Sequence, residues 1–248
     1  MPDVKDLLAG RSDLSTFFVH FTRGQADGTS AREVLLKILN GQVLKASRVH
    51  GIGKALLEEK AAPQEVLDQL SVVCMSEAPM AHWSMFCSEI PGRSWRFAPY
   101  GLVFTKDWAR GYGFNPVWYL NTVPGQSWLT TPLNELAQIA SNGKARAWDG
   151  NGELKDVRFR DSQIAKILPF IETAGVGKDF SWEREWRRVG SVSFLPQETV
   201  AVLAPEEDHP AFQAEYDRQC ESSDWPTTTL NLVDPTWPLS RIQGAVSR

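Results

Sequence analysis

The order of apolar and polar positions in the first third of the chain predicts strands alternating with helices. An aromatic and β-branched run at 14–22 predicts a strand. The helix predicted after it begins at a capping-box sequence with Ser30 as N-cap and ends at Gly41. A short helix is predicted over 63–70, and the apolar run at 71–77 predicts a buried strand.

The middle of the chain has a weaker periodic pattern. Residues 78–99 are rich in tryptophan and proline, which is typical of a long loop over a cleft. Strands are predicted at 101–105 and 116–121, on either side of a short helix around 107–110. Residues 143–160 are polar and carry charges of both signs, so they predict either a solvated loop or a surface for base stacking and phosphate contact.

Helical and alternating patterns return after residue 130. Thr131 followed by Pro132 predicts the start of a helix that ends near Gly143. Apolar residues at helical spacing predict another helix over 161–173. The side chains of residues 180–189 alternate strictly with a period of two, which predicts a strand.

The closing pattern is two strands, at 199–203 and 229–233, with a helix near 209–220 between them. Strands scattered among short helices, without regular βαβ spacing, predict an α+β fold with a largely antiparallel sheet. No repeat or linker interrupts the pattern, so residues 1–248 are expected to form a single domain.

Charge and cysteine usage narrow the function classes. The 248 residues include 26 Lys+Arg and 30 Asp+Glu, and the net charge of −4 excludes a protein that coats nucleic acid by bulk charge. The three cysteines (Cys74, Cys87 and Cys220) lack CxxC spacing, so neither a zinc site nor a disulfide framework is expected. No basic-then-apolar leader and no apolar run of about 18–20 residues occurs, which predicts a cytoplasmic protein without membrane contact.

The sharpest candidate for chemistry is the alternating segment with two glutamates. On a strand, Glu183, Glu185 and Arg187 would share one face. Their two carboxylates would then lie about 6–7 Å apart, close enough to raise one another's pKa and to flank a small reacting group. The alternative is a solvated strand face on which glutamate and arginine pair at the surface.

Three further positions combine a polar side chain with a predicted strand. His20 and Thr22 share a face of the first strand and could hold a polar ligand; the alternative is a histidine satisfied within the core. Ser76 and Glu77 end a strand, where they either line a cleft or cap the next helix. Tyr100 could stack on a flat ring, and the alternative is a core position.

Several short motifs occur in an order and spacing that are specific as a set. They are HisPheThr at 20–22, LysIleLeuAsnGly at 37–41, ValCysMetSerGlu at 73–77, TyrGlyLeuValPheThrLys at 100–106, AsnProValTrpTyr at 115–119 and PheSerTrpGluArgGluTrpArg at 180–187. Together they resemble the AbiGi family of bacterial abortive-infection proteins, which often occur in phage-resistance loci. The resemblance extends from about residue 15 to about residue 200.

More distantly, the layout resembles ADP-ribosyltransferase folds such as DarT toxins and RNA 2′-phosphotransferases. This resemblance implies a split, mostly antiparallel sheet with short helices packed around a cleft, and NAD as co-substrate without a metal. It implies that Glu185 is the catalytic glutamate and that Glu183 orients the nucleophile. The residues that it places against NAD are His20, Thr22, Arg48, Ser76 and Tyr100.

The resemblance implies a phage-defence transferase that moves ADP-ribose from NAD to an acceptor. The acceptor would be a nucleic acid, with RNA favoured over single-stranded DNA, or a protein; Arg187 and Trp148 would contact it. A cognate antitoxin or a chaperone would be a further partner. One alternative is a non-catalytic antitoxin-like or sensor interaction module of a defence system. Another is a hydrolase of NAD or RNA that uses the same carboxylates.

Overall fold

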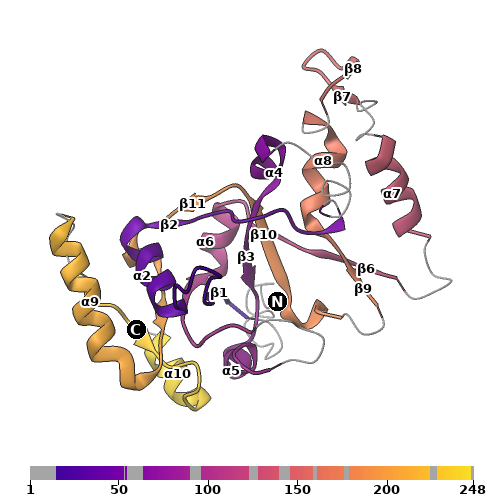
Figure 1. Cartoon of the computed structure of the whole chain (residues 1–248). Helices are drawn as coiled ribbons and strands as arrows, with labels where there is room; N and C mark the ends of the chain where they lie inside the picture. Colours follow the sequence, from indigo (N-terminus) through magenta and orange to yellow (C-terminus); the bar gives the residue numbers. More distant parts are fainter. Residues whose placement is uncertain are drawn as a thin grey trace, which may run out of the picture. The chain divides into compact units, whose positions relative to one another are not determined.

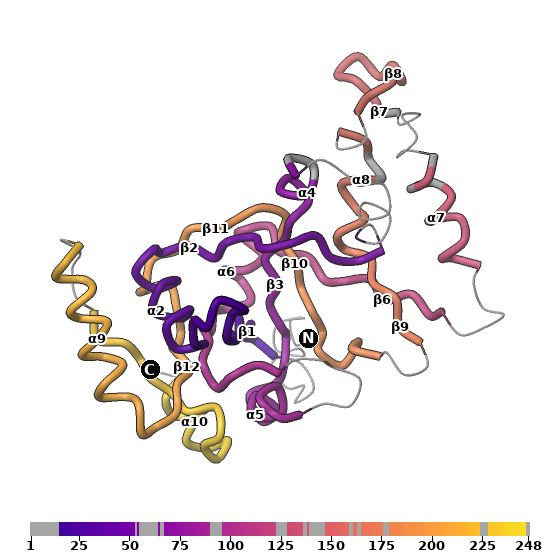
Figure 2. The backbone as a smooth tube through the Cα atoms, in the orientation of Figure 1, coloured from indigo at the N-terminus to yellow at the C-terminus, as the bar shows by residue number. Residues whose placement is uncertain are grey.

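The structure is a computed structural model, and its backbone is traced in Figures 1 and 2. It describes residues 15–52, 54, 64–89, 96–122, 128–139, 146–158, 161–175, 179–223 and 228–246. Contacts divide the chain into two compact units, each assembled from segments that are distant in the sequence. Unit 1 is Met1–Leu44, Met75–Gly113 and Ser193–Arg248, and unit 2 is Lys45–Cys74 and Phe114–Val192. The single domain expected over 1–248 stays a prediction.

The sheet of unit 1 has the strand order β13-β12-β4-β1-β3. Strand β1 pairs antiparallel with β3 and β4, and β12 pairs antiparallel with β4 but parallel with β13. The mostly antiparallel α+β architecture predicted from the sequence is therefore confirmed. The bounds are Phe17–Phe21 for β1, Val72–Ser76 for β3, Gly101–Thr105 for β4, Ala201–Leu203 for β12 and Leu232–Val233 for β13.

A large apolar core lies in unit 1 and extends into the segment predicted as a loop. Trp83 and Phe86 are fully buried in this core beside Phe21 and Val103. Their burial orders the segment into a 3₁₀ turn, η1 (Met80–His82), and a short helix, α5 (Trp83–Phe86). The prediction of an irregular loop over 78–99 was wrong for these residues, because large buried aromatic side chains stabilise a compact turn.

The helices of unit 1 begin and end close to where the sequence predicts. Helix α2 has Ser30 as its N-cap with a complete capping box, but its left-handed C-cap is Gln42, at φ 50°, and not Gly41. Helix α9 contacts α2, and the two lie side by side in Figure 1. The C-terminal helix α10 was not predicted. The bounds are Ala31–Gly41 for α2, Lys106–Gly111 for α6, His209–Ser222 for α9 and Leu239–Val246 for α10. Short elements complete the unit: β2 (Val43–Leu44), β11 (Val192–Ser193), η6 (Pro196–Glu198) and η7 (Glu206–Asp208).

Ser30→Ala is expected to lower the free energy of unfolding by about 1 kcal/mol, because the hydroxyl of Ser30 accepts the N–H of Glu33 at 3.2 Å. Urea unfolding followed by circular dichroism measures the change. The matched control is Ser240→Ala, at an exposed helical position where no hydrogen bond of the hydroxyl occurs among the described residues. Equal stability of the two variants would contradict a working cap.

Unit 2 is built from short strands and helices. Strand β10 pairs antiparallel with β5. Strands β6 and β9 form a separate parallel pair, visible in Figure 2, and β7 and β8 form an antiparallel hairpin. The bounds are Asn115–Pro116 for β5, Trp118–Asn121 for β6, Arg146–Trp148 for β7, Leu154–Asp156 for β8, Ile171–Ala174 for β9 and Glu185–Val189 for β10. The helices are α4 (Gln64–Leu70), α7 (Thr130–Ile139) and α8 (Gln163–Ile167).

Two predicted elements of unit 2 are interrupted in the structure. The helix predicted over 161–173 ends at Ile167, because Pro169 has no N–H to continue it; the 3₁₀ turn η4 (Leu168–Phe170) follows, and Ile171 begins β9. The strand predicted over 116–121 is split between β5 and β6 at Val117.

Two further predictions for unit 2 need smaller changes. Helix α7 begins at Thr130, so Thr131 is inside the helix and is not its N-cap, and the predicted end near Gly143 lies outside the described residues. The polar segment 143–160, predicted as a loop, contains the β7–β8 hairpin. Cross-strand pairing decides the hairpin, because the local sequence carries no strong strand pattern there.

Candidate functional site

The segment that carries both candidate glutamates is not one continuous strand. Residues Ser181–Glu183 form a 3₁₀ turn, η5, and Arg184 adopts a left-handed backbone with φ 47° before β10 begins at Glu185. Asp179 favours the turn because its Oδ1 accepts the Ser181 N–H at 3.0 Å and the Ser181 hydroxyl at 2.6 Å. The expectation that Glu183 and Glu185 share a strand face is therefore wrong.

Glu185 and Arg187 do share a face of β10, and they form an ion pair. The Arg187 side chain is 2% exposed, and its Nη2 donates to Glu185 Oε2 at 2.6 Å. The same nitrogen donates to Glu172 Oε2 at 3.0 Å, and Nη1 donates to the Pro169 carbonyl at 2.8 Å. Arg187, expected to contact substrate, is thus the buried centre of a group of charges within unit 2.

Two half-buried residues complete this group. The donor atoms of His50, Cys74 and Glu185 all lie within 4.8 Å of one another. We name Arg187, Glu185, Glu172, Cys74 and His50 the Arg187 cluster. His50, Cys74 and Glu172 were missed as site residues by the sequence analysis. They come from three separate segments, and no linear spacing connects a histidine, a cysteine and a glutamate that meet only through folding.

Burial and charge shift the pKa values of groups in and beside the cluster. Burial opposes the charge of Arg187, but the neighbouring Glu185 carboxylate outweighs it and raises the pKa of the guanidinium. Burial raises the pKa of the Cys74 thiol well above its usual range, and the negative charge of Glu185 adds to the shift. Burial also raises the pKa of Tyr119, again with a contribution from Glu185. The Cys74 thiol is therefore protonated at neutral pH, and Arg187 is charged.

Arg48, implied as the arginine that contacts the NAD phosphates, lies in unit 2 beside the cluster. It forms an isolated β-bridge with Val72, and its exposed side chain donates from Nε to His50 Nε2 at 3.1 Å. Because a guanidinium only donates, the acceptor nitrogen of His50 carries a lone pair and the proton is on Nδ1. Arg48 thus fixes the tautomer of His50, and its contact with NAD stays a prediction.

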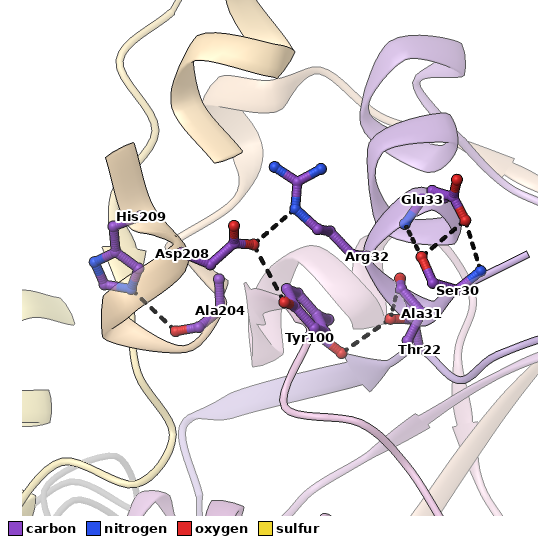
Figure 3. A network of polar contacts seen from close by, with 9 residues as sticks. All are labelled: Thr22, Ser30, Ala31, Arg32, Glu33, Tyr100, Ala204, Asp208 and His209. Carbon is purple, nitrogen blue, oxygen red and sulfur yellow. Dashed lines mark hydrogen bonds and ion pairs between the residues drawn. The ribbon is translucent and has the colours of Figure 1, made fainter. Parts of the chain in front are cut away.

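A second polar network lies in unit 1 and is drawn in Figure 3. Tyr100 and Arg32 both donate to Asp208 Oδ2, at 3.2 and 2.8 Å. The Thr22 hydroxyl donates to the Ala31 carbonyl at 2.9 Å. Burial and the Asp208 charge raise the pKa of Tyr100 to about 12, so its phenol keeps its proton. Thr22 and Tyr100 are joined to the protein's own groups, and their contacts with NAD stay predictions.

The predicted site residues are divided between the units. His20, Thr22, Ser76 and Tyr100 lie in unit 1, and Arg48, Trp148, Glu183, Glu185 and Arg187 lie in unit 2. Half-buried His20 is on β1 and lies opposite Leu102 of β4, and Ser76 is buried at the end of β3. Trp148 is 66% exposed on the β7–β8 hairpin. The described contacts join Glu185 with Arg187 in unit 2 and Thr22 with Tyr100 in unit 1.

The fold defines an α+β protein with a mostly antiparallel sheet and several short helices. Comparison with known protein families shows to which of them the chain is related. The family model described as abortive phage resistance protein AbiGi, antitoxin, matches residues 54–221. This match covers more than half of the chain, so the chain belongs to the AbiGi family, which confirms the resemblance seen in the sequence. No curated protein and no solved structure matches the chain. The ADP-ribosyltransferase-like fold stays a prediction.

The family ties the chain to abortive infection and phage defence, and its description names an antitoxin. A search of the described helices finds none that is both long enough and apolar enough to cross a membrane. The expected cytoplasmic location, and the choice of nucleic acid or protein as acceptor, stay predictions.

Proposed function

We propose that the chain acts in phage defence as a non-catalytic antitoxin that binds a protein partner. One observation carries the proposal: the carboxylate of Glu185 is held by the buried guanidinium of Arg187 at 2.6 Å. Cleavage of the nicotinamide–ribose bond builds positive charge on the ribose, which an enzyme stabilises with a nearby carboxylate. A buried cation beside Glu185 opposes that charge, and Glu183 is not placed beside it on the strand.

The β7–β8 hairpin supplies a surface suited to such a partner. Trp148 and Leu154 are directly opposite each other across the hairpin, and their side chains are 66% and 37% exposed. Exposed tryptophan is a frequent centre of binding energy in protein interfaces, because its large flat ring fills a pocket on the partner. We infer that this pair contacts the toxin that the chain neutralises.

The first test asks for NAD chemistry directly. The purified chain is incubated with NAD labelled on its adenylate half, with RNA, single-stranded DNA and lysate as separate acceptors. We expect no labelled acceptor and no nicotinamide release, and no difference between the wild type and Glu185→Gln. Label transfer that disappears in Glu185→Gln would establish a transferase instead, and nicotinamide release without label would establish a hydrolase.

The second test asks whether the chain neutralises a toxin. Genes that neighbour this one are screened for a toxin that arrests growth alone and is tolerated when the chain is present. Trp148→Ala is expected to weaken binding of that toxin at least tenfold, because truncating a central interface tryptophan costs about 2 kcal/mol or more. Trp128→Ala is the matched control, since Trp128 is 73% exposed in the same unit but outside the hairpin. Equal protection by both variants would remove the hairpin from the interface.

A further inference from the structure

We propose that His50, Cys74 and Glu185 bind a divalent metal ion of the zinc class. The three side chains offer an imidazole nitrogen, a sulfur and a carboxylate oxygen, all within 4.8 Å of one another. Zn²⁺ accepts all three donor types, whereas the hard ions Mg²⁺ and Ca²⁺ select oxygen and avoid sulfur. The inference goes beyond the antitoxin role and does not depend on it.

The separations are close to those of a loaded site. Bonds of about 2.0–2.3 Å around a tetrahedral Zn²⁺ place the ligand atoms roughly 3.5 Å apart. The three donor atoms therefore need to approach by at most about 1.3 Å, which side-chain rotation supplies. All three residues are half-buried. Three protein ligands leave a fourth position for a water molecule.

The charges of the Arg187 cluster act on a bound cation in two opposite ways: Arg187 repels it, and the two carboxylates attract it and outnumber Arg187. Glu185 and Glu172 each pair with Arg187, so two negative charges surround one positive charge and the sum is −1. Binding a divalent ion while the Cys74 thiol releases its proton to water adds one positive charge, which brings the sum to zero. Arg187 holds Glu185 through Oε2, and this contact orients the carboxylate.

An unpaired donor in the cluster is an independent observation. The Nε of Arg187 is buried and has no hydrogen-bond acceptor among the described residues. Buried polar groups are almost always paired, so this N–H indicates that a further oxygen-bearing group belongs in the cluster. A water molecule within the cluster would be such a group.

Arg48 competes with the proposed ion. Its Nε–H occupies the lone pair of His50 Nε2, which is the lone pair that a metal ion would take. The Arg48 side chain is exposed and can move into water. Removal of this side chain is therefore expected to strengthen metal binding, while removal of any ligand weakens it. A metal affinity that rises in one variant and falls in the others distinguishes a metal site from a general loss of structure.

The test is a titration of the full-length, reduced protein with Co²⁺, followed by competition with Zn²⁺. We expect one bound ion, with the near-ultraviolet absorption of a cobalt–thiolate bond. Cys74→Ser should lose this absorption, Cys74→Ser and His50→Ala should each weaken binding at least tenfold, and Arg48→Ala should tighten it several-fold. Cys87→Ser, at a cysteine of unit 1, should leave the thiolate absorption and the metal affinity unchanged.

Circular dichroism of each variant separates loss of a ligand from loss of the fold. Absence of the thiolate absorption in the wild type would overturn the proposal. So would its persistence in Cys74→Ser, its loss in Cys87→Ser, or weaker binding by a folded Arg48→Ala. Thermal unfolding with and without Zn²⁺ gives a second readout, because an ion that binds only the folded state raises the unfolding temperature.

Discussion

Arg187→Met is expected to lower the free energy of unfolding by about 3–5 kcal/mol, the usual cost of removing one partner from a buried ion pair. The side chain is 2% exposed and binds Glu185, Glu172 and the Pro169 carbonyl. Methionine fills similar space but leaves the two half-buried carboxylates beside each other without their cation. Urea unfolding at neutral pH, followed by circular dichroism, measures the loss.

Two controls make this result specific to the cluster. Arg158→Met removes an exposed ion pair with Asp161 in the same unit, whose N–O distance is 2.9 Å, and should cost less than about 1 kcal/mol. The double variant Arg187→Met with Glu185→Gln removes the cation and one carboxylate together, and should recover part of the stability. If Arg187→Met is as stable as Arg158→Met, the cluster does not hold unit 2 together.

Gly51→Ala is expected to lower the free energy of unfolding by about 2–5 kcal/mol, the sum of a left-handed backbone cost and an overpacking cost. Gly51 has φ +77°, and a Cβ there would lie 2.3 Å from the Ile171 carbonyl oxygen and 2.6 Å from that of Leu168. Both atoms are backbone at the start of β9 and in η4, so neither can move aside as a flexible side chain would. The same unfolding assay measures the effect.

Gly28→Ala separates the two contributions. Gly28 has φ +89°, and a Cβ there meets nothing within 4 Å, so only the backbone cost of about 1–2 kcal/mol applies. The difference between the two variants reports the close approach at Gly51 alone. Equal losses would show that the chain does not pass so near to Gly51 in solution.

Elements with a local cause could be predicted from the sequence. Helix α2 begins where Ser30 and Glu33 form a capping box, and β1, β3 and β4 form from apolar and β-branched runs. Both kinds of signal depend on neighbours within about one turn or one strand, so they are visible in the linear sequence. Pro169 was a local signal for the interruption of the helix predicted over 161–173. That prediction followed the apolar periodicity and did not take the proline into account.

The candidate site could be predicted only in part. Glu185 and Arg187 are two residues apart on one strand, so their proximity follows from strand geometry. Glu183 appeared equivalent in the alternating sequence, but the turn at Ser181–Glu183 and the left-handed Arg184 remove it from that face. No periodic pattern reveals a single residue with positive φ when that residue is an arginine.

The sequence by itself determined the α+β class, most strands and helices, and membership of the AbiGi family, because periodicity, capping and motif order are properties of neighbouring residues. Only the tertiary structure decided that Arg187 is buried and that Glu172, Cys74 and His50 gather around it. Arginine alone predicts exposure, and its burial requires carboxylates delivered by other segments. The chemistry of the cluster therefore comes from the pairing of segments that are distant along the chain.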